Sequence, residues 1–189
     1  MVSDLLISSR RNPLLRRLRS LATRAGRESE GMVLLEGTHL LQELLLQGAG
    51  LQEVIATDHW IERHSHLLEN LDSEIPIRRV TEEVLRAALS TVTPDGVACL
   101  CPLECFPSPS HQASFQLVLD RIQDPGNLGT LLRTALAADI EAVWLGAGAD
   151  PLSPKVLRAS SGSLLQLPHH RFGPDGEKAV EQMEQKLKE

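Results

Sequence analysis

Four polar residues with chemically useful side chains lie within one short stretch of the chain. The stretch offers an amide, two hydroxyls and a guanidinium, supplied by Asn127, Thr130, Arg133 and Thr134. No carboxylate follows them until Asp139. Such a set can orient a hydroxyl group and hold a phosphate. The alternative interpretation is an ordinary capped helix with one solvated arginine.

Residues 117–139 are predicted to form the strand, turn and helix that position these side chains. The apolar run 117–119 indicates a buried strand, and Asp-Pro-Gly at 124–126 indicates a turn. Asn127 then stands where a helix N-cap is expected. At about 100° per residue, the polar residues share one side of the helix. The other side is apolar and comprises Leu128, Leu131, Leu132, Ala135 and Leu136.

The segment DPGNLGTLLRTALAAD (124–139) resembles motif 1 of the SpoU (TrmH-type) RNA ribose 2′-O-methyltransferases, members of the SPOUT superfamily. That motif is Asn-x-Gly, with Arg-Thr-Ala beginning four residues after the glycine. The matching residues here are Asn127, Gly129, Arg133, Thr134 and Ala135. The segment PLSPKVLRASSGSLLQLP (151–168) resembles the next segment of the same family.

The resemblance implies methyl transfer from S-adenosylmethionine to a ribose 2′-hydroxyl, with Asn127 and Arg133 as the catalytic residues. A guanidinium stays protonated at ordinary pH, so we expect Arg133 to bind the adjacent phosphate and polarise the 2′-oxygen. Asn127 would fix Arg133 or the ribose. The other expected RNA contacts in this half are Gly129, which would allow close backbone approach, and Thr130, Thr134, Lys155 and Arg158. A homodimer is also expected.

The N-terminal segment is strongly basic. Residues 1–27 contain seven arginines and one aspartate, a charge of +6, so the remainder of this −6 chain carries −12. A helix is predicted over 13–25, with Asn12 as its cap. Its arginines form either a solubilising face or an RNA contact. Because SSRRNPLLRRLRSLATRAGR resembles the basic lead-in of SpoU proteins, we expect RNA contacts from Arg10, Arg11, Arg16 and Arg17.

Strands and helices are predicted to alternate up to residue 103, which indicates an α/β fold. The predicted strands are 32–36, 51–57, 75–80 and 97–101, and the predicted helices are 38–47, 59–71 and 82–89. The phrases VLLEGTHLL and LSTVTPDGVACL resemble the opening and closing of the family's substrate-binding domain, whose fold is like a ribosomal RNA-binding protein. We predict a basic arm (1–29), this domain (30–103), a linker (104–114) and a methylase segment (115–189).

In the methylase segment, further elements are predicted after the motif helix. They are a strand at 142–145, a glycine loop at 146–148, a helix from Pro154, a strand at 164–167 and a final helix with Val180, Met183 and Leu187 on one side. Ligands bind at the carboxyl edge of such sheets, where the glycine loop lies. The pattern G-x-G-x-x-G, which would begin at Gly146, is not met because Pro151 stands at its third glycine position. This disfavours a classical dinucleotide site, and with it the alternative that the chain is an unrelated nucleotide-binding enzyme.

Cysteine and histidine do not form a convincing metal site. Cys99, Cys101 and Cys105 have no nearby histidine, so buried thiols in a reducing cytosol are preferred to a zinc site. His169 and His170, expected just beyond a strand, are interpreted as surface or packing residues. No apolar run approaches the ~18 residues of a membrane span, so a soluble cytoplasmic protein without metal is expected.

Two motifs of the SpoU family are not found between residues 168 and 189. One is a Gly-Glu-rich strand and loop, and the other is a Ser-Leu-Asn segment that threads a deep trefoil knot. They build the S-adenosylmethionine pocket, so we expect the first half of a SPOUT domain with the knot region absent and the cofactor pocket largely missing. Either the missing half is supplied and the protein is a methyltransferase, or this is a truncated, inactive RNA-binding or dimerisation module.

Overall fold

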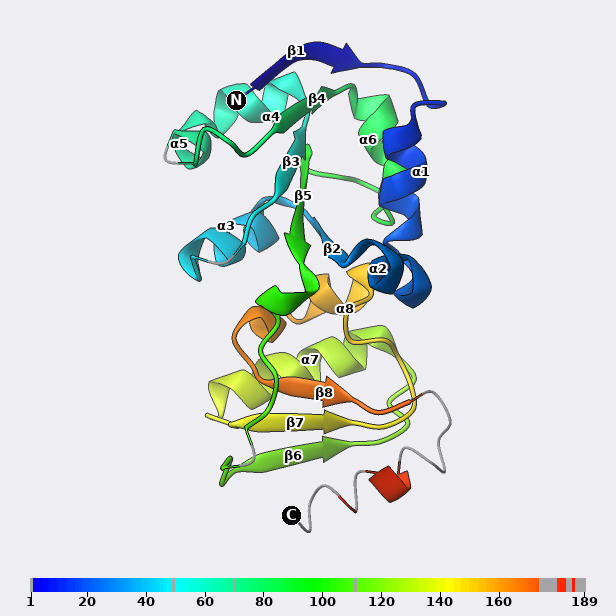
Figure 1. Cartoon of the computed structure of the whole chain (residues 1–189), viewed down its shortest axis with the longest axis vertical. Helices are drawn as coiled ribbons and strands as arrows, with labels where there is room; N and C mark the ends of the chain where they lie inside the picture. Colours follow the sequence, from blue (N-terminus) through cyan, green and yellow to red (C-terminus); the bar gives the residue numbers. More distant parts are fainter. Residues whose placement is uncertain are drawn as a thin grey trace. The chain divides into compact units, whose positions relative to one another are not determined.

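The computed structural model describes residues 2–48, 50–69, 71–110, 112–173, 180–182 and 185. The chain divides into two compact units, Met1–Cys105 and Phe106–Glu189. Both units combine a sheet with helices (Figure 1), which confirms the α/β class. No helix in the described ranges is long and apolar enough to cross a membrane.

The first unit is built on a five-stranded mixed sheet. Its strand order is β1-β4-β3-β5-β2, with β1, β4 and β3 parallel and β5 antiparallel to both of its neighbours. The strands are β1 (Val2–Ile7), β2 (Met32–Glu36), β3 (Glu53–Ala56), β4 (Ile77–Val80) and β5 (Val97–Pro102). Four of the five were predicted, and β2 has the predicted bounds.

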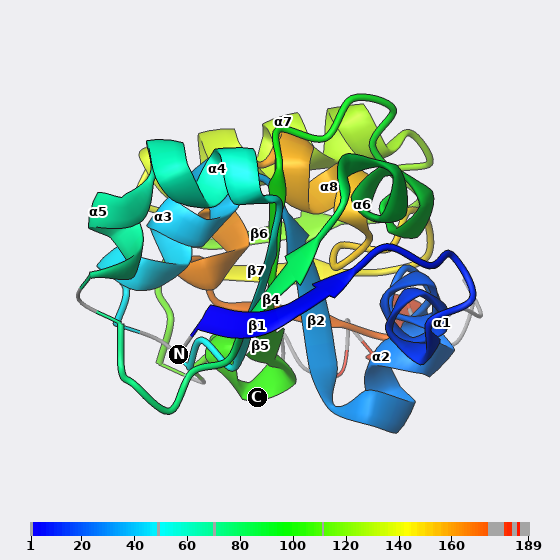
Figure 2. The same ribbon diagram turned by 90° about the horizontal axis from the view of Figure 1, so that it is seen from above.

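Helices cover both faces of this sheet, with α1, α2 and α6 on one side and α3, α4 and α5 on the other (Figures 1 and 2). The helices are α1 (Pro13–Ser20), α2 (Arg24–Glu30), α3 (Thr38–Leu46), α4 (Asp58–Arg63), α5 (Ser65–Leu68) and α6 (Glu82–Ala88), followed by the 3-10 turn η1 (Leu103–Cys105). The core beneath α1 and α6 is aliphatic. It includes Leu15, Leu18, Ile55, Val84 and Leu85.

The N-terminal segment differs from the prediction of a separate arm. Residues 2–7 form the edge strand β1, which pairs with β4. This strand was missed because its side chains are mostly exposed, Leu5 at 71%, and give no alternating pattern. Residues 1–29 therefore belong to the first unit.

The helix predicted over 13–25 is two helices. Asn12 caps α1 as expected, its side chain accepting the N–H of Leu14 at 2.9 Å. Thr23 then caps α2 by accepting the N–H of Gly26 at 3.1 Å. A Cβ on Gly26 would lie 2.0 Å from the Ser20 carbonyl oxygen, so the sharp turn between the helices requires glycine there.

Two further expectations about the first unit are settled. The single helix predicted over 59–71 is interrupted at His64, whose backbone leaves the helical region at φ −124°. Cys99 and Cys101 are fully buried in β5, as predicted, whereas Cys105 is only half-buried, and burial raises the pKa of all three thiols. Among the described residues, no three His, Cys, Asp or Glu side chains form a group that could hold a metal.

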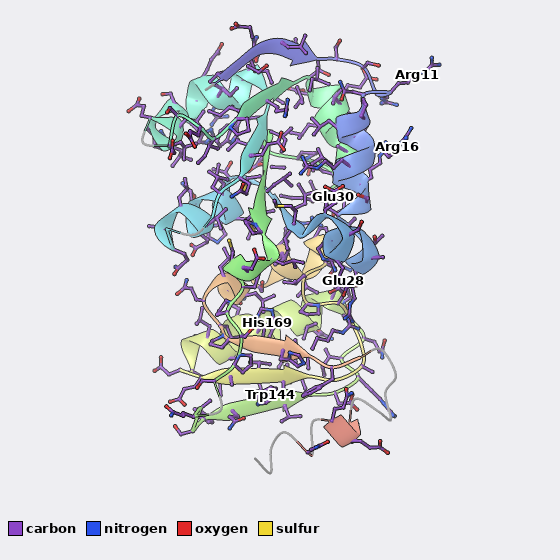
Figure 3. The ribbon with its side chains drawn as sticks, in the orientation of Figure 1. Arg11, Arg16, Glu28, Glu30, Trp144 and His169 are labelled. Carbon is purple, nitrogen blue, oxygen red and sulfur yellow. The ribbon has the colours of Figure 1, made fainter. Side chains whose placement is uncertain are left out.

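The second unit is a three-stranded parallel sheet in the order β6-β7-β8, with helices α7 and α8 packed on one face. Its elements are β6 (Gln116–Leu119), α7 (Pro125–Ala137), β7 (Ala142–Leu145), α8 (Pro154–Ala159), the 3-10 turn η2 (Ser163–Leu165) and β8 (His169–Arg171). On the other face, the rings of Trp144 and Phe172 stack with centroids 5.9 Å apart. Trp144 is labelled in Figure 3.

The strand predicted over 164–167 was wrong. Residues 163–165 form η2 instead, and the strand β8 contains His169 and His170, which were expected beyond a strand. Leu164, Leu165 and Leu167 are all buried, so their run carries no alternation to separate strand from turn. Of the predicted final helix, Val180 lies in the helical residues 180–182, whereas Met183 and Leu187 fall outside the described residues.

Candidate functional site

The candidate site begins at the loop that joins β6 to α7. Asp124 is the N-cap of α7, because its Oδ1 atom accepts the N–H of Asn127 at 2.8 Å. Pro125, which has no N–H to satisfy, occupies the first helical position. The prediction that Asn127 caps the helix was therefore wrong. Asn127 is the third helical residue, and its exposed side-chain amide has no partner among the described residues.

An open groove of about 640 Å³ lies beside the first turns of α7. It is lined by Arg121, Ile122, Gln123, Asp124, Asn127, Thr130 and Leu131. Leu131 was predicted on the buried side of the helix but is 37% exposed and forms part of the groove wall. The predicted site residues Asn127 and Thr130 thus lie together, and the Thr130 hydroxyl also donates to the Gly126 carbonyl at 2.9 Å.

Arg133 does not line this groove. It is exposed, and it has no hydrogen bond or ion pair to any residue that the structure describes. It follows Asn127 by six residues, about 9 Å along the helix axis. Thr134 is exposed beside it. The two predicted catalytic residues therefore lie on one helix, one in the groove and one beyond it.

Gly129 is buried and packs on helix α8. A Cβ at this position would lie 2.5 Å from the Cβ of Ala159 and 2.8 Å from the backbone nitrogen of Ser160. The close backbone approach expected at Gly129 is thus made by the protein's own chain. On α8, Lys155 is exposed, whereas Arg158 is half-buried and its side chain is not free of partners.

The loops at the carboxyl edge of β6 and β7 pack against each other. Ile122 and Gly148 form a parallel bridge, and the N–H of Ala149 donates to the Ile122 carbonyl at 2.8 Å. Gly148 has φ 124°, and a Cβ there would lie 2.6 Å from the Ile122 oxygen. The predicted glycine loop is therefore occupied by the β6–α7 loop.

The basic residues of the first unit have different environments. Arg11 and Arg16 are exposed and extend away from the ribbon (Figure 3), without side-chain partners among the described residues. Arg10 forms an exposed ion pair with Glu83 at 2.9 Å. All three were predicted as RNA contacts.

Arg17 was predicted as an RNA contact, but the structure places it in an internal ion network. Its guanidinium lies 3.0 Å from Glu30 and 2.9 Å from Glu53, and Glu53 also pairs with Arg78. Burial alone would lower the pKa of Arg17, but the hydrogen bonds and charges of Glu30 and Glu53 raise it. Because Glu53 is buried, this network joins α1 to the sheet.

Sequence reasoning did not assign Arg121, Gln123 or Asp124 to the site. Their place directly after a parallel strand was the available signal, because the carboxyl ends of strands hold the binding loops of such sheets. The sequence predicted a turn at 124–126 before the helix, but it assigned no residue of that turn to the site.

Comparison with known proteins identifies both halves of the chain. Residues 114–188 match the SpoU rRNA Methylase family, and residues 12–99 match the MRM3-like substrate binding domain. An uncharacterized tRNA/rRNA methyltransferase of Synechocystis is 46% identical, over 88% of this chain and 62% of that protein. The 23S rRNA (guanosine(2553)-2'-O)-methyltransferase RlmP of Bacillus subtilis is 33% identical, over 86% of this chain and 63% of that protein.

A solved structure is similar in fold. The AdoMet bound rRNA methyltransferase from Sinorhizobium meliloti superposes with a TM-score of 0.74 at 26% identity, covering 97% of this chain and 69% of that one. The chain thus spans slightly less than two thirds of the length of the two curated relatives.

Proposed function

Because this chain belongs to the SpoU rRNA Methylase family, we propose that it acts in the transfer of a methyl group from S-adenosylmethionine to a ribose 2′-hydroxyl of rRNA or tRNA. The observation that carries the proposal is the exposed polar face of α7. It presents Asn127, Arg133 and Thr134 and bears no carboxylate between Asp124 and Asp139. A cationic and hydrogen-bonding face of this kind suits an anionic RNA backbone.

Arg133 is the principal catalytic residue in this proposal. Its guanidinium remains protonated, so it binds the phosphate next to the target ribose and donates to the 2′-oxygen as negative charge develops there. The hydroxyl proton leaves through that phosphate or water. When bound, S-adenosylmethionine supplies an activated sulfonium methyl group, so the enzyme's main task is to orient the hydroxyl.

Asn127 holds the ribose or the Arg133 side chain by hydrogen bonds, since its amide both donates and accepts. The remaining RNA contacts come from both units. They are the exposed residues Thr130, Thr134 and Lys155 and the half-buried Arg158 in the second unit, and the exposed residues Arg10, Arg11 and Arg16 in the first. The match of residues 12–99 to a substrate binding domain supports RNA contacts from the first unit.

The test is single-turnover methylation of an rRNA fragment by this chain, with radiolabelled S-adenosylmethionine in the millimolar range. Label at a 2′-oxygen, detected as resistance of the adjacent phosphodiester to alkali, supports the proposal. RNA binding without transfer supports instead the RNA-binding or dimerisation module. Light scattering tests the homodimer that we also propose, and cell fractionation tests the cytoplasmic location.

The methyl donor is expected to bind this chain weakly. In the loop at 146–148, the backbone of Gly148 is bridged to Ile122, so a ligand cannot approach Gly148 from that side. Isothermal calorimetry with S-adenosylmethionine should show no saturable binding below the millimolar range. A micromolar dissociation constant would contradict this account of the edge.

A further inference from the structure

Arg121 has a left-handed backbone conformation directly after strand β6, with φ 56°. This conformation is unfavourable for a residue with a side chain. Two hydrogen bonds hold it in place. The Arg121 N–H donates to the Ala147 carbonyl at 2.8 Å, and the Ala147 N–H donates to Asp120 Oδ1 at 3.1 Å. Strained residues that their surroundings hold in this way cluster at ligand sites.

The strained residue lines the groove beside α7, and its side chain is 63% exposed. Asp124 lines the same groove and uses one carboxylate oxygen to cap α7. Ile122 and Leu131 supply the apolar wall. The groove therefore combines a fork of N–H donors, a carboxylate acceptor and an apolar surface.

We propose that this groove binds an unstacked guanine base of the RNA substrate, with Arg121 as the residue that selects it. This inference rests on the proposed function. Guanine presents two acceptors, O6 and N7, which a planar guanidinium contacts together. It also presents the donors N1–H and N2–H₂, which suit the carboxylate of Asp124. The base plane packs on Ile122 and Leu131, as unpaired RNA bases pack on protein surfaces.

The same side chains disfavour other occupants. Adenine presents an amino group where guanine has O6, so it would place a donor against the donors of Arg121. A phosphate would lie close to two carboxylates, because Asp120 pairs with Arg121 at 3.5 Å and Asp124 lines the groove. Like charges at such range repel.

The experiment is an NMR titration of the 189-residue chain, methyl-labelled at isoleucine and leucine, with GMP, AMP or inorganic phosphate. The methyl signals of Ile122 and Leu131 report occupation of the groove. We expect GMP to bind at least about tenfold more tightly than AMP, the scale of one bidentate base contact. Inorganic phosphate should leave both signals in place at the concentrations that saturate GMP.

Four variants make the titration decisive. Arg121→Lys keeps the charge without the planar fork and should reduce the GMP preference to less than about threefold. Arg121→Gly should lose the preference as well, while melting no lower than wild type because glycine accepts a positive φ. Asp124→Asn retains a good N-cap and should weaken GMP binding. Arg63→Ala, which removes an exposed arginine of the first unit, should change nothing.

Equal binding of GMP and AMP, or a full preference in Arg121→Lys, would overturn the inference. Displacement of GMP by inorganic phosphate alone would also overturn it, because the groove would then be an anion site. The titration contains no methyl donor, so its outcome is independent of whether the chain transfers a methyl group. Failure of methylation with a retained GMP preference would therefore reject the proposed function and keep the guanine site.

Discussion

Arg133 is exposed on α7, and no described residue pairs with its guanidinium. Arg133→Ala should therefore change the free energy of unfolding by less than about 1 kcal/mol. Methyl transfer should fall by at least ~10²-fold, the usual effect of losing one preorganised donor. Single-turnover methylation and a thermal melt of the same preparation measure the two quantities.

Arg133→Lys separates charge from geometry. Lysine keeps the positive charge but cannot hold a phosphate and the 2′-oxygen with one planar fork, so transfer should remain reduced by about the same factor. Arg63→Ala is the matched control, since it removes another exposed arginine and should leave transfer unchanged. Near-wild-type transfer by Arg133→Ala would remove Arg133 from the catalytic site.

At the scale of residues, the sequence predicted the types of group in the site better than their local roles. Asn127 was expected as the helix cap, but Asp124 performs that role. Asn and Asp cap helices equally well, so the sequence does not show which of the two is the N-cap. The structure shows it, because the side chain of Asp124 accepts a backbone N–H of the first turn. Arg16 and Arg17 are neighbours in sequence, yet one is exposed and the other binds Glu53. A basic run does not show which members have internal acidic partners.

The packing of α7 on α8 depends on Gly129. Gly129→Ala would place a Cβ 2.5 Å from that of Ala159. The overpacking should lower the free energy of unfolding by about 1–3 kcal/mol, which exceeds the gain of up to ~1 kcal/mol from helix propensity. Urea unfolding monitored by Trp144 fluorescence measures the effect in this unit.

Gly126→Ala is the control for that substitution. It lies in the same helix, but its Cβ would meet only the Asp124 carboxylate oxygen, at 3.0 Å. Its effect should stay within about 1 kcal/mol in either direction. If Gly129→Ala were as stable as Gly126→Ala, the contact between the two helices would not limit the residue at position 129.

Strand β8 gives the second unit a dependence on pH. His169 lies against Phe106, and burial lowers its pKa below the ordinary 6.5 despite the hydrogen bond to the Leu167 carbonyl. The unfolded chain therefore binds a proton more readily than the folded unit. Stability should fall as pH drops through 6.5 and continue to fall down to the lowered pKa of the folded state.

Thermal melts at pH 7.5 and 5.5 test this dependence. The wild-type second unit should melt at a lower temperature at pH 5.5, and His169→Gln should remove most of the difference. His59→Gln, at an exposed histidine, should keep it. An equal pH dependence in His169→Gln would show that another group is responsible.

At the scale of elements, periodicity and caps predicted most of the fold. Strands β2, β5 and β7 and the cap of α6 at Thr81 were located correctly, because Gly, Pro and Thr mark their ends. The edge strand β1 was missed, since only one face of it is covered and its polarity does not alternate. The turn η2 was taken for a strand because a fully buried apolar run fits either structure.

At the scale of the whole molecule, positive charge is concentrated in residues 1–27, which carry +6, whereas the remainder carries −12. Deleting residues 1–27 would be the simplest test of whether this basic segment binds RNA, but the deletion does not isolate that contribution. It would remove β1 and α1 and with them part of the sheet and core of the first unit. Point variants at exposed arginines avoid this loss of structure.

Arg11 and Arg16 are the arginines to test, because both are exposed and neither pairs with a described side chain. If each contacts one phosphate, the double variant Arg11→Ala/Arg16→Ala should reduce the slope of log affinity against log salt by roughly 1.5. Fluorescence anisotropy of a labelled rRNA fragment, measured at several salt concentrations, gives this slope. The melting temperature of the double variant should equal that of wild type.

Arg17→Ala, next to Arg16 in the sequence, should affect stability and leave RNA binding unchanged. It removes the ion pairs to Glu30 and Glu53, so unfolding should become easier by about 2 kcal/mol, the scale of hydrogen bonds to charged groups. Because its guanidinium already binds carboxylates, the salt slope measured below the melting transition should not change. An unchanged slope in the double variant would mean that Arg11 and Arg16 are only solvated. A reduced slope in Arg17→Ala would mean that the internal network opens to bind RNA.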